Sequence, residues 1–342
     1  MNKLHHQQNF NFLLTSILLV SLILYYGKFL LLPLLLAIFI FVIIKSLSEK
    51  LVNFFEKKFN LHLNTSFSLV LVLIFFLAII YFFWKILEQN LTNVVQKADY
   101  YQNNLIKISN FFSDFEVNTL VEVNNFFESV NFLNIFSKII NYLTELTGNF
   151  SLIIIYVIFF IIEEKFLIQK INFLFKKNRT IKILKKINVD IFRYFQIKTL
   201  TSMLIGLVTY IVLFSINIDL APTFGMLAFF LNFIPFIGSL LSVVIPSLFS
   251  FIQFLDLFNT ISIFIILSIF QILIGNFLET KLMGKTLNIS PIVMIIFLSV
   301  MGHIWGVAGM FLSVPMLVFM LIVFSNFQST KNLSIIISEK VD

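Results

Sequence analysis

Long runs of hydrophobic residues alternate with short polar segments along most of this 342-residue chain. Five uninterrupted runs cover residues 12–26, 29–44, 67–84, 150–162 and 200–216. Because a helix of roughly 17 to 25 apolar residues crosses a bilayer, these runs predict membrane-spanning helices. Gly27 and Lys28 form a turn between the first two runs, which predicts a helical hairpin. No small-residue cleavage site follows the first run, so we interpret it as a retained span and not as a signal peptide.

Two further hydrophobic runs, both in the last third of the chain, are interrupted. Residues 221–254 contain a first set of breaks at Asn232, Pro235, Gly238 and Pro246. Residues 291–324, which begin at Pro291, contain a second set at Gly302, Gly306, Gly309 and Pro315. Pro and Gly release backbone groups that lipid cannot satisfy, so such breaks must be buried in protein or line a wet cavity. Paired interrupted runs around an intact helix, here at about 260–277, are typical of transporter binding sites.

The interrupted runs allow two topologies. If each is one long broken crossing, there are about eight spans and Lys281 and Lys285 lie outside the cell. If each is a re-entrant hairpin, there are about six spans and these lysines face the cytoplasm. We favour the hairpins by analogy with transporters whose half-helices meet at the midplane, and this choice also fits the excess of Lys and Arg in cytoplasmic loops. The lysine-rich loop expected at residues 45–66 is cytoplasmic by the same rule, and both termini then lie inside.

Two polar segments between the spans have amphipathic patterns. Residues 85–148 place apolar residues at helical spacing among acids and amides. This predicts helices on the non-cytoplasmic face, either as an extramembrane subdomain or as a coiled coil or surface helix. Lys170–Lys198 is the most basic part of the chain, and Ile187, Ile191 and Phe195 fall on one face of it. We expect this segment to lie in the headgroup layer against anionic lipid.

Composition fixes the class of protein. Hydrophobic residues make up 59% of the chain and charged residues 12%, whereas a soluble domain has roughly 45–50% and 25%. The mean hydropathy is +0.99. We therefore predict an all-α polytopic membrane protein with about 6–8 transmembrane helices, some of them broken or re-entrant in the C-terminal half. The net charge of +7 fits membrane orientation better than nucleic-acid binding.

Enzyme chemistry finds no support in the motifs. The chain has no H-E-x-x-H, G-x-S-x-G, Walker glycine loop or CxxC motif, and four His with no Cys do not readily assemble a zinc site. We expect neither catalysis nor a bound metal or cofactor. Without a nucleotide-binding loop, transport would be driven by a gradient or be passive.

These patterns divide the chain into five expected parts. Residues 1–84 hold the N-terminal hairpin and third span, 85–148 the amphipathic segment, and 149–198 the fourth span with the basic helix. Residues 199–330 would form a transport core with broken helices, and 331–342 a cytoplasmic tail.

The polar strip between residues 271 and 291 is the first place to look for function. It holds Asn276, Glu279, Lys281 and Lys285, with Gly275 and Gly284 nearby. An ionisable group between apolar runs is costly unless it is paired, hydrated or useful. Glu279 is therefore either an ion ligand or proton carrier, or the partner of Lys281 or Lys285 at a helix end.

Each of the other candidate residues has a functional and a structural interpretation. Asn232 and Asn276 either coordinate a solute or cation or join helices by hydrogen bonds. The two lysines either bind an anionic or hydroxyl-rich solute or extend to the membrane interface. His303 is either a proton relay or structural. The Pro and Gly residues named above would bend the backbone, allow close packing or act as hinges.

Three motifs resemble those of the AI-2E family of transporters. Asn232–Gly238 fits the pattern N-x-I-P-x-I-G. Gly275–Lys285, followed by Pro291, fits G-N-x-x-E-x-K-x-M-G-K and a later Pro. Gly302–Gly309 with Val314 and Pro315 resembles the closing signature, and the basic helix running into Gly206 is similar too. The family usually has Pro directly after the Glu, whereas this chain has Thr280, so the helix is expected to end less sharply after Glu279.

The resemblance implies a bacterial inner-membrane transporter with both termini cytoplasmic and a homo-oligomeric state. Some relatives are associated with export of the signal autoinducer-2, and others with sodium or proton exchange. Our main hypothesis is a gradient-driven or facilitative exporter of a small polar solute, its path lined by residues 232–238, 276–285 and 302–315. The alternatives are a Na+(K+)/H+ antiporter with Glu279 as the exchanging carboxylate, and a non-transporting membrane scaffold.

Overall fold

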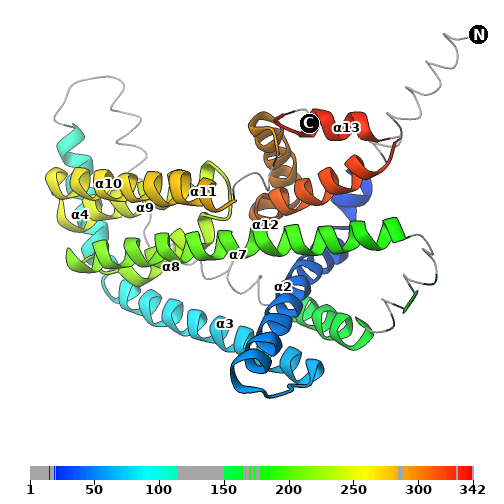
Figure 1. Cartoon of the computed structure of the whole chain (residues 1–342). Coiled ribbons are helices and arrows are strands. Elements are labelled where there is room, and N and C mark those ends of the chain that lie inside the picture. Colours follow the sequence, from blue (N-terminus) through cyan, green and yellow to red (C-terminus); the bar gives the residue numbers. More distant parts are fainter. Residues whose placement is uncertain are drawn as a thin grey trace, which may run out of the picture. The chain divides into compact units, whose positions relative to one another are not determined.

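Helices make up the architecture of the described chain. The computed structural model describes residues 21–113, 150–164, 178–283, 288–328 and 330–340, together with the single positions 15, 19, 166, 169, 170 and 173. In these ranges the backbone is almost wholly helical and contains no strand (Figure 1). Six helices there are long and apolar enough to cross a membrane, and they cover Lys28–Phe59, Thr65–Asn90, Lys186–Ser215, Ile237–Phe254, Leu257–Met283 and Pro291–Asn326. The prediction of an all-α polytopic membrane protein is confirmed.

The chain divides into two compact units, each assembled from distant stretches of sequence. Unit 1 comprises residues 1–50, 147–192 and 286–342, and unit 2 comprises 51–146 and 193–285. The division falls inside two long helices, α2 (Lys28–Phe59) and α7 (Asn178–Ser215).

Several helices extend beyond the apolar runs that predicted them. α2 continues through Lys45 to Phe59, where a loop was expected. No Pro or Gly interrupts residues 45–59, so nothing in the backbone ends the helix there. The change from apolar to polar residues at Lys45 therefore marks the end of the apolar surface and not the end of the helix. α3 (Thr65–Gln96) likewise runs past the predicted span and is followed by α4 (Ala98–Ser113). The rest of the predicted amphipathic segment, residues 114–148, lies outside the described residues.

The basic segment and the fifth span are one helix and not two. α7 runs without a break from Asn178 to Ser215. Ile187, Ile191 and Phe195, predicted to face the lipid headgroups, are buried within the protein. The basic segment therefore continues into the span as one helix, in line with a basic helix that runs into Gly206, but the expectation that these three side chains face the lipid headgroups is wrong.

The first interrupted run is a helical hairpin. α8 (Ala221–Leu231) and α9 (Ile237–Phe254) are joined by residues 232–236. The rings of Phe224, near the start of α8, and Phe249, near the end of α9, lie 5.2 Å apart. At the tip, a Cβ on Gly238 would clash with the Leu231 carbonyl oxygen. Only glycine allows this approach, so the chain reverses where Pro235 and Gly238 predicted a break.

The second interrupted run also folds back on itself. α12 (Pro291–Asn326) is broken at Gly306, whose φ of 63° and ψ of −146° are not helical. A Cβ on Gly309 would clash with the Met301 carbonyl oxygen, although residues eight positions apart in a straight helix are separated by roughly 12 Å. Both interrupted runs are therefore helical hairpins.

The open end of the α8–α9 hairpin is held by α4 within unit 2. Tyr100 Oη donates to the Gln253 carbonyl at 2.7 Å, and Asn104 Nδ2 donates to the Ile252 carbonyl at 2.9 Å. These are carbonyls of the last turn of α9, which have no partner within the helix itself. Tyr101 is fully buried and donates its hydroxyl to Asp219, between α7 and α8. The hairpin therefore has a fixed base and a polar tip.

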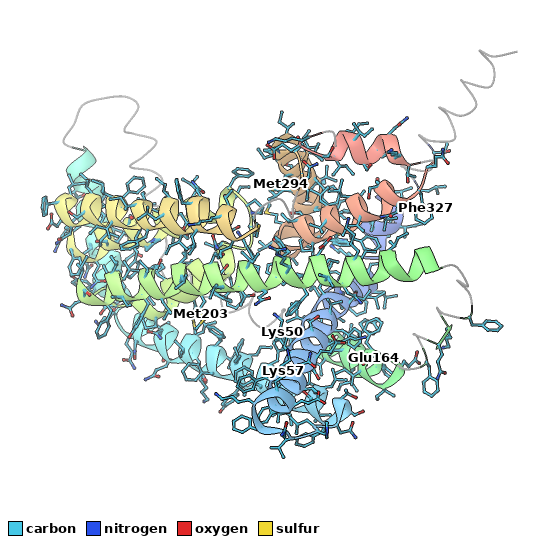
Figure 2. All side chains as sticks on the ribbon, viewed as in Figure 1. Lys50, Lys57, Glu164, Met203, Met294 and Phe327 are labelled. Atoms are coloured by element: carbon cyan, nitrogen blue, oxygen red, sulfur yellow. The ribbon has the colours of Figure 1, made fainter. Side chains whose placement is uncertain are left out.

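Many large apolar side chains remain exposed on the helices, as expected of a surface that contacts lipid (Figure 2). Met203 on α7, labelled in Figure 2, is an example in unit 2. In unit 1, Glu164 accepts from Lys45 Nζ at 2.7 Å, and Lys50 Nζ lies 4.6 Å from the centre of the Phe192 ring. These contacts tie α2 to residues 150–164 and to the first part of α7.

Candidate functional site

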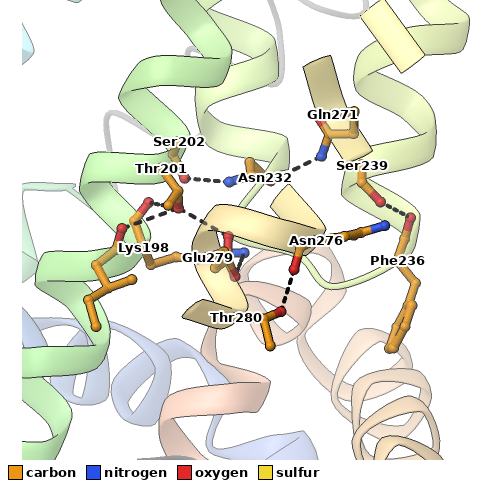
Figure 3. A network of polar contacts seen from close by, with 11 residues as sticks. Lys198, Thr201, Ser202, Asn232, Phe236, Ser239, Gln271, Asn276, Glu279 and Thr280 are labelled. Atoms are coloured by element: carbon orange, nitrogen blue, oxygen red, sulfur yellow. Dashed lines mark hydrogen bonds and ion pairs between the residues drawn. The ribbon is translucent and has the colours of Figure 1, made fainter. Parts of the chain in front are cut away.

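A buried ion pair lies at the centre of the polar residues of unit 2. Lys198 Nζ on α7 is 2.6 Å from Glu279 Oε1, at the start of α11 (Glu279–Met283) (Figure 3). The two side chains are only 8% and 13% exposed. Thr201, one turn further along α7 and fully buried, donates its hydroxyl to Glu279 Oε2 at 3.0 Å. Both carboxylate oxygens of Glu279 are thus hydrogen-bonded.

A π-helical segment sets the direction of Glu279. α10 (Leu257–Gln271) leads into a π-helix, Ile272–Leu278, and the Glu279 N–H donates to the Ile274 carbonyl five residues back. A π turn holds one residue more than an α turn. The step from Gln271 to Glu279 is eight residues, which is more than two turns of an α-helix. Because the π turn takes up one extra residue, this step becomes close to two full turns, and both side chains lie on the same side of the helix. Such π segments occur often at functional sites.

A second set of polar side chains continues from the ion pair toward the hairpin tip. Asn232, at the end of α8, donates through Nδ2 to Ser202 Oγ at 2.9 Å. Gln271 Nε2 donates to Asn232 Oδ1 at 3.3 Å. All three side chains are buried, and Ser202 follows directly after Thr201 on α7. Figure 3 shows this set and the ion pair side by side, with α7, α8 and the α10–α11 region each contributing.

The structure brings together only part of the predicted site. Glu279 and Asn232 are central to it. The side chain of Asn276 is exposed, and its carbonyl accepts from the Thr280 hydroxyl. Lys281 is exposed, whereas Gly284 and Lys285 lie outside the described residues. The hypothesis that Glu279 pairs with Lys281 is wrong, because its partner is Lys198 from α7.

The remaining predicted residues belong to backbone breaks or to unit 1. Gly275 lies within the π-helix, and the helix continues past Thr280 to Met283. His303 is exposed on α12 next to the break at Gly306, and Pro291 is at the first turn of that helix. Pro315 causes no break; it is buried inside the second helical arm.

Sequence reasoning missed four members of the site: Lys198, Thr201, Ser202 and Gln271. Two of them carried a signal. Lys198 is the last basic residue before an apolar run, and Gln271 is the last polar residue before the π-helix within another. The two hydroxyl residues carried none, because Ser and Thr are common in membrane helices as internal hydrogen-bonding groups.

The arrangement is chemically balanced. Two opposite charges cancel, while two hydroxyls and two amides supply both donors and acceptors. Across the described residues, no three His, Asp or Glu side chains gather in a way that would hold a metal ion. These groups can therefore exchange hydrogen bonds with a polar, uncharged ligand without a change in the net charge of the site.

The sequence of this chain is similar to those of known transport proteins. Residues 13–329 match the family described as AI-2E family transporter. A Borreliella burgdorferi protein named "Putative transport protein" is 33% identical over 258 residues, 72% of this chain and 69% of its own length. The Escherichia coli AI-2 transport protein TqsA is 30% identical over 146 residues, 43% of this chain and 42% of its own. YhhT of the same organism, also named as a putative transport protein, is 29% identical over 188 residues, about half of each chain. A match over residues 13–329 shows that this chain belongs to the AI-2E family of transporters.

Proposed function

We propose that this protein exports a small, uncharged, hydroxyl-rich solute of the autoinducer-2 type by a gradient-driven or facilitative mechanism. The observation that carries the proposal is the buried polar site of unit 2, in which Lys198 and Glu279 neutralise each other beside two amides. TqsA, which matches part of this chain, is named for AI-2 transport.

The neutral balance of the site favours a solute over a bare cation. A cation that bound Glu279 would have to displace the Lys198 ammonium from a contact of 2.6 Å. The displaced ammonium would then be buried without a partner, at a cost of several kcal/mol. An uncharged solute adds no charge to the site. It needs only to exchange hydrogen bonds with hydroxyl and amide groups, which is nearly neutral in free energy.

The rest of the molecule completes the proposal. We place the protein in the bacterial inner membrane with both termini in the cytoplasm, and the N-terminal spans would support a homo-oligomer. The basic segment Lys170–Lys198 would contact anionic lipid through its exposed residues, such as Lys186. The α12 hairpin, with Gly302, Gly306 and Gly309 at its break, would move during transport.

Uptake of autoinducer-2 into inverted membrane vesicles tests the proposal, since export from the cell becomes uptake in that orientation. We expect uptake with wild-type protein and a loss of about tenfold or more with Glu279→Gln, which leaves Lys198 buried and unpaired. Lys97→Met is the matched control, because it removes a lysine from an exposed ion pair of the same unit and should leave uptake unchanged.

A second assay distinguishes the antiporter. Purified protein in sealed proteoliposomes with an internal pH-sensitive dye is given a sodium or potassium gradient. The proposed exporter gives a flat trace. Proton movement that follows the cation gradient in wild type and disappears in Glu279→Gln, without uptake of autoinducer-2, would overturn the proposal and identify an antiporter.

A further inference from the structure

We infer that the side-chain amides of Gln271 and Asn232 bind the hydroxyl groups of the transported solute and set its specificity, an inference that rests on the proposed function. The two amides come from different elements, since Gln271 ends α10 and Asn232 ends α8 at the hairpin tip. They meet through one hydrogen bond, from Gln271 Nε2 to Asn232 Oδ1.

That bond is the longest in the site. It measures 3.3 Å, compared with 2.6 Å for Lys198 to Glu279 and 2.9 Å for Asn232 to Ser202. N–H···O bonds in proteins are commonly about 2.9–3.0 Å long. A solute hydroxyl that donates to Asn232 and accepts from Gln271 would replace this long bond with two shorter ones. The site therefore has one contact that opens at little cost.

The two amides are held to different extents. The side chain of Asn232 is anchored by Ser202, which is fully buried on α7. The backbone N–H of Asn232 donates to the Ala228 carbonyl. Among the described residues, the side chain of Gln271 makes one hydrogen bond, the long one to Asn232, although its amide has two donor hydrogens and an acceptor oxygen. Asn232 would thus orient the solute, and Gln271 would adjust to it.

Gly275 leaves room for that adjustment. A Cβ on Gly275 would lie 3.0 Å from Gln271 Nε2 and 3.8 Å from Ile205 Cδ1. Any side chain at this position of the π-helix would press on the amide and limit its movement. The absence of one keeps the Gln271 amide free to rotate toward a ligand.

The chemistry points to hydroxyl groups as the recognised feature. A primary amide both donates and accepts, as does a hydroxyl, so two amides can bind a diol through complementary bonds. A site built to hydrogen-bond a hydroxyl rejects the analogue that lacks it, because the buried polar groups are then left unpaired. The adjacent pair of opposite charges disfavours a solute with a net charge, which would leave one charge in excess.

Discrimination between two solutes tests the inference. We expect wild-type protein to transport autoinducer-2 with a kcat/KM at least about tenfold above that of an analogue lacking one hydroxyl. Gln271→Met, similar in size but without the amide, should reduce this preference to about twofold or less, mainly by raising KM for autoinducer-2. Leu267→Met is the matched control, one turn earlier on the same buried face of α10, and should keep the wild-type preference.

Retention of the full preference in Gln271→Met, with autoinducer-2 still transported, would overturn the inference and leave the proposed function intact. Failure of the wild-type protein to transport autoinducer-2 would overturn the proposed function instead. The site can then be tested without transport, since the chain contains no cysteine.

A single cysteine tests whether Gln271 is reached by solutes from water. Gln271→Cys should react with a small hydrophilic methanethiosulfonate reagent at least about tenfold faster than Ile263→Cys. Ile263 lies two turns earlier on α10 and is fully buried in the core. Equal, slow labelling of both would place Gln271 away from any solute path and overturn the inference whatever the protein transports.

Discussion

Two of the lysine–carboxylate ion pairs in the described part of unit 2, both between residues far apart in the sequence, differ mainly in their surroundings. Lys198 and Glu279 are 2.6 Å apart, and Lys97 and Asp219 are 2.7 Å apart. The side chains of the first pair are 8% and 13% exposed, whereas those of the second are 52% and 26% exposed. Each carboxylate also accepts a hydrogen bond from a hydroxyl group, which belongs to Thr201 in the first pair and to Tyr101 in the second.

The length of an ion pair alone does not distinguish a functional candidate from a surface contact. An exposed pair contributes little because water and salt screen both charges. A buried pair costs several kcal/mol of desolvation, and its main energetic effect appears when one partner is lost. A charge kept at such cost within apolar helices is a functional candidate, whereas the exposed pair at the hairpin base carries no such cost.

The largest expected effect is loss of one member of the buried pair. We predict that Glu279→Gln or Lys198→Met destabilises the protein by about 3–5 kcal/mol, because one buried charge remains without a partner. Thermal unfolding in detergent measures this as a lowered Tm. The double variant Lys198→Met/Glu279→Leu should recover much of the loss, since it removes both charges. A double variant as unstable as the sum of the single ones would show that the pair is not a coupled unit.

The next largest effect is expected where α7 crosses α8, since Ser202 on α7 and Asn232 at the end of α8 both belong to the site. A Cβ on Gly206 of α7 would lie 2.7 Å from the Gly225 carbonyl oxygen of α8. Gly206→Val should therefore force the helices apart at a cost of about 1–3 kcal/mol. The separation also lengthens the Asn232–Ser202 contact, so autoinducer-2 uptake should fall together with Tm. Wild-type uptake with Gly206→Val would mean that the close crossing is not needed for the site.

Sequence reasoning reached the fold more fully than the site. Apolar runs marked the spans, and Pro235, Gly238 and Gly306 marked the hairpin tips, because backbone breaks in lipid have few alternatives. Glu279 was found because it is a charge among apolar residues. Its partner Lys198, 81 residues away, was not found, since pairing between helices depends on packing. The π-helix after Gln271 also leaves no distinct pattern in the sequence, and it decides which residues face the site.

A smaller effect is expected from loss of the Tyr101 hydroxyl, which donates to Asp219 of the exposed pair. Tyr101→Phe removes the bond to Asp219 but leaves Lys97 in place, so we predict a loss of about 1 kcal/mol in stability. Transport should stay near wild type, because Tyr101 holds the base of the hairpin and not its tip. A variant that folds normally but loses uptake would extend the functional site to α4.

The same tyrosine gives a prediction for alkaline pH. Burial, and then the hydrogen bond to Asp219, raise the pKa of Tyr101 above its usual value. A raised pKa in the folded state means that the stabilisation is complete below the unfolded value of about 10 and is lost as the pH rises beyond it. The difference in Tm between wild type and Tyr101→Phe should therefore shrink above about pH 10. A constant difference across that range would contradict the assignment.

The smallest effect is expected when the exposed Lys97–Asp219 pair is broken. Lys97→Met breaks an ion pair as short as the buried one, yet we predict a loss of only about 0.2–1 kcal/mol, because Lys97 is half exposed and Asp219 keeps its bond to Tyr101. Raising the salt concentration should reduce even this difference, since screening already weakens the wild-type pair. The measurement is the Tm of both proteins at low and high salt, with Glu279→Gln beside them. If Lys97→Met cost as much as Glu279→Gln, burial would not be what separates the two pairs, and the argument that singles out Glu279 would lose its physical basis.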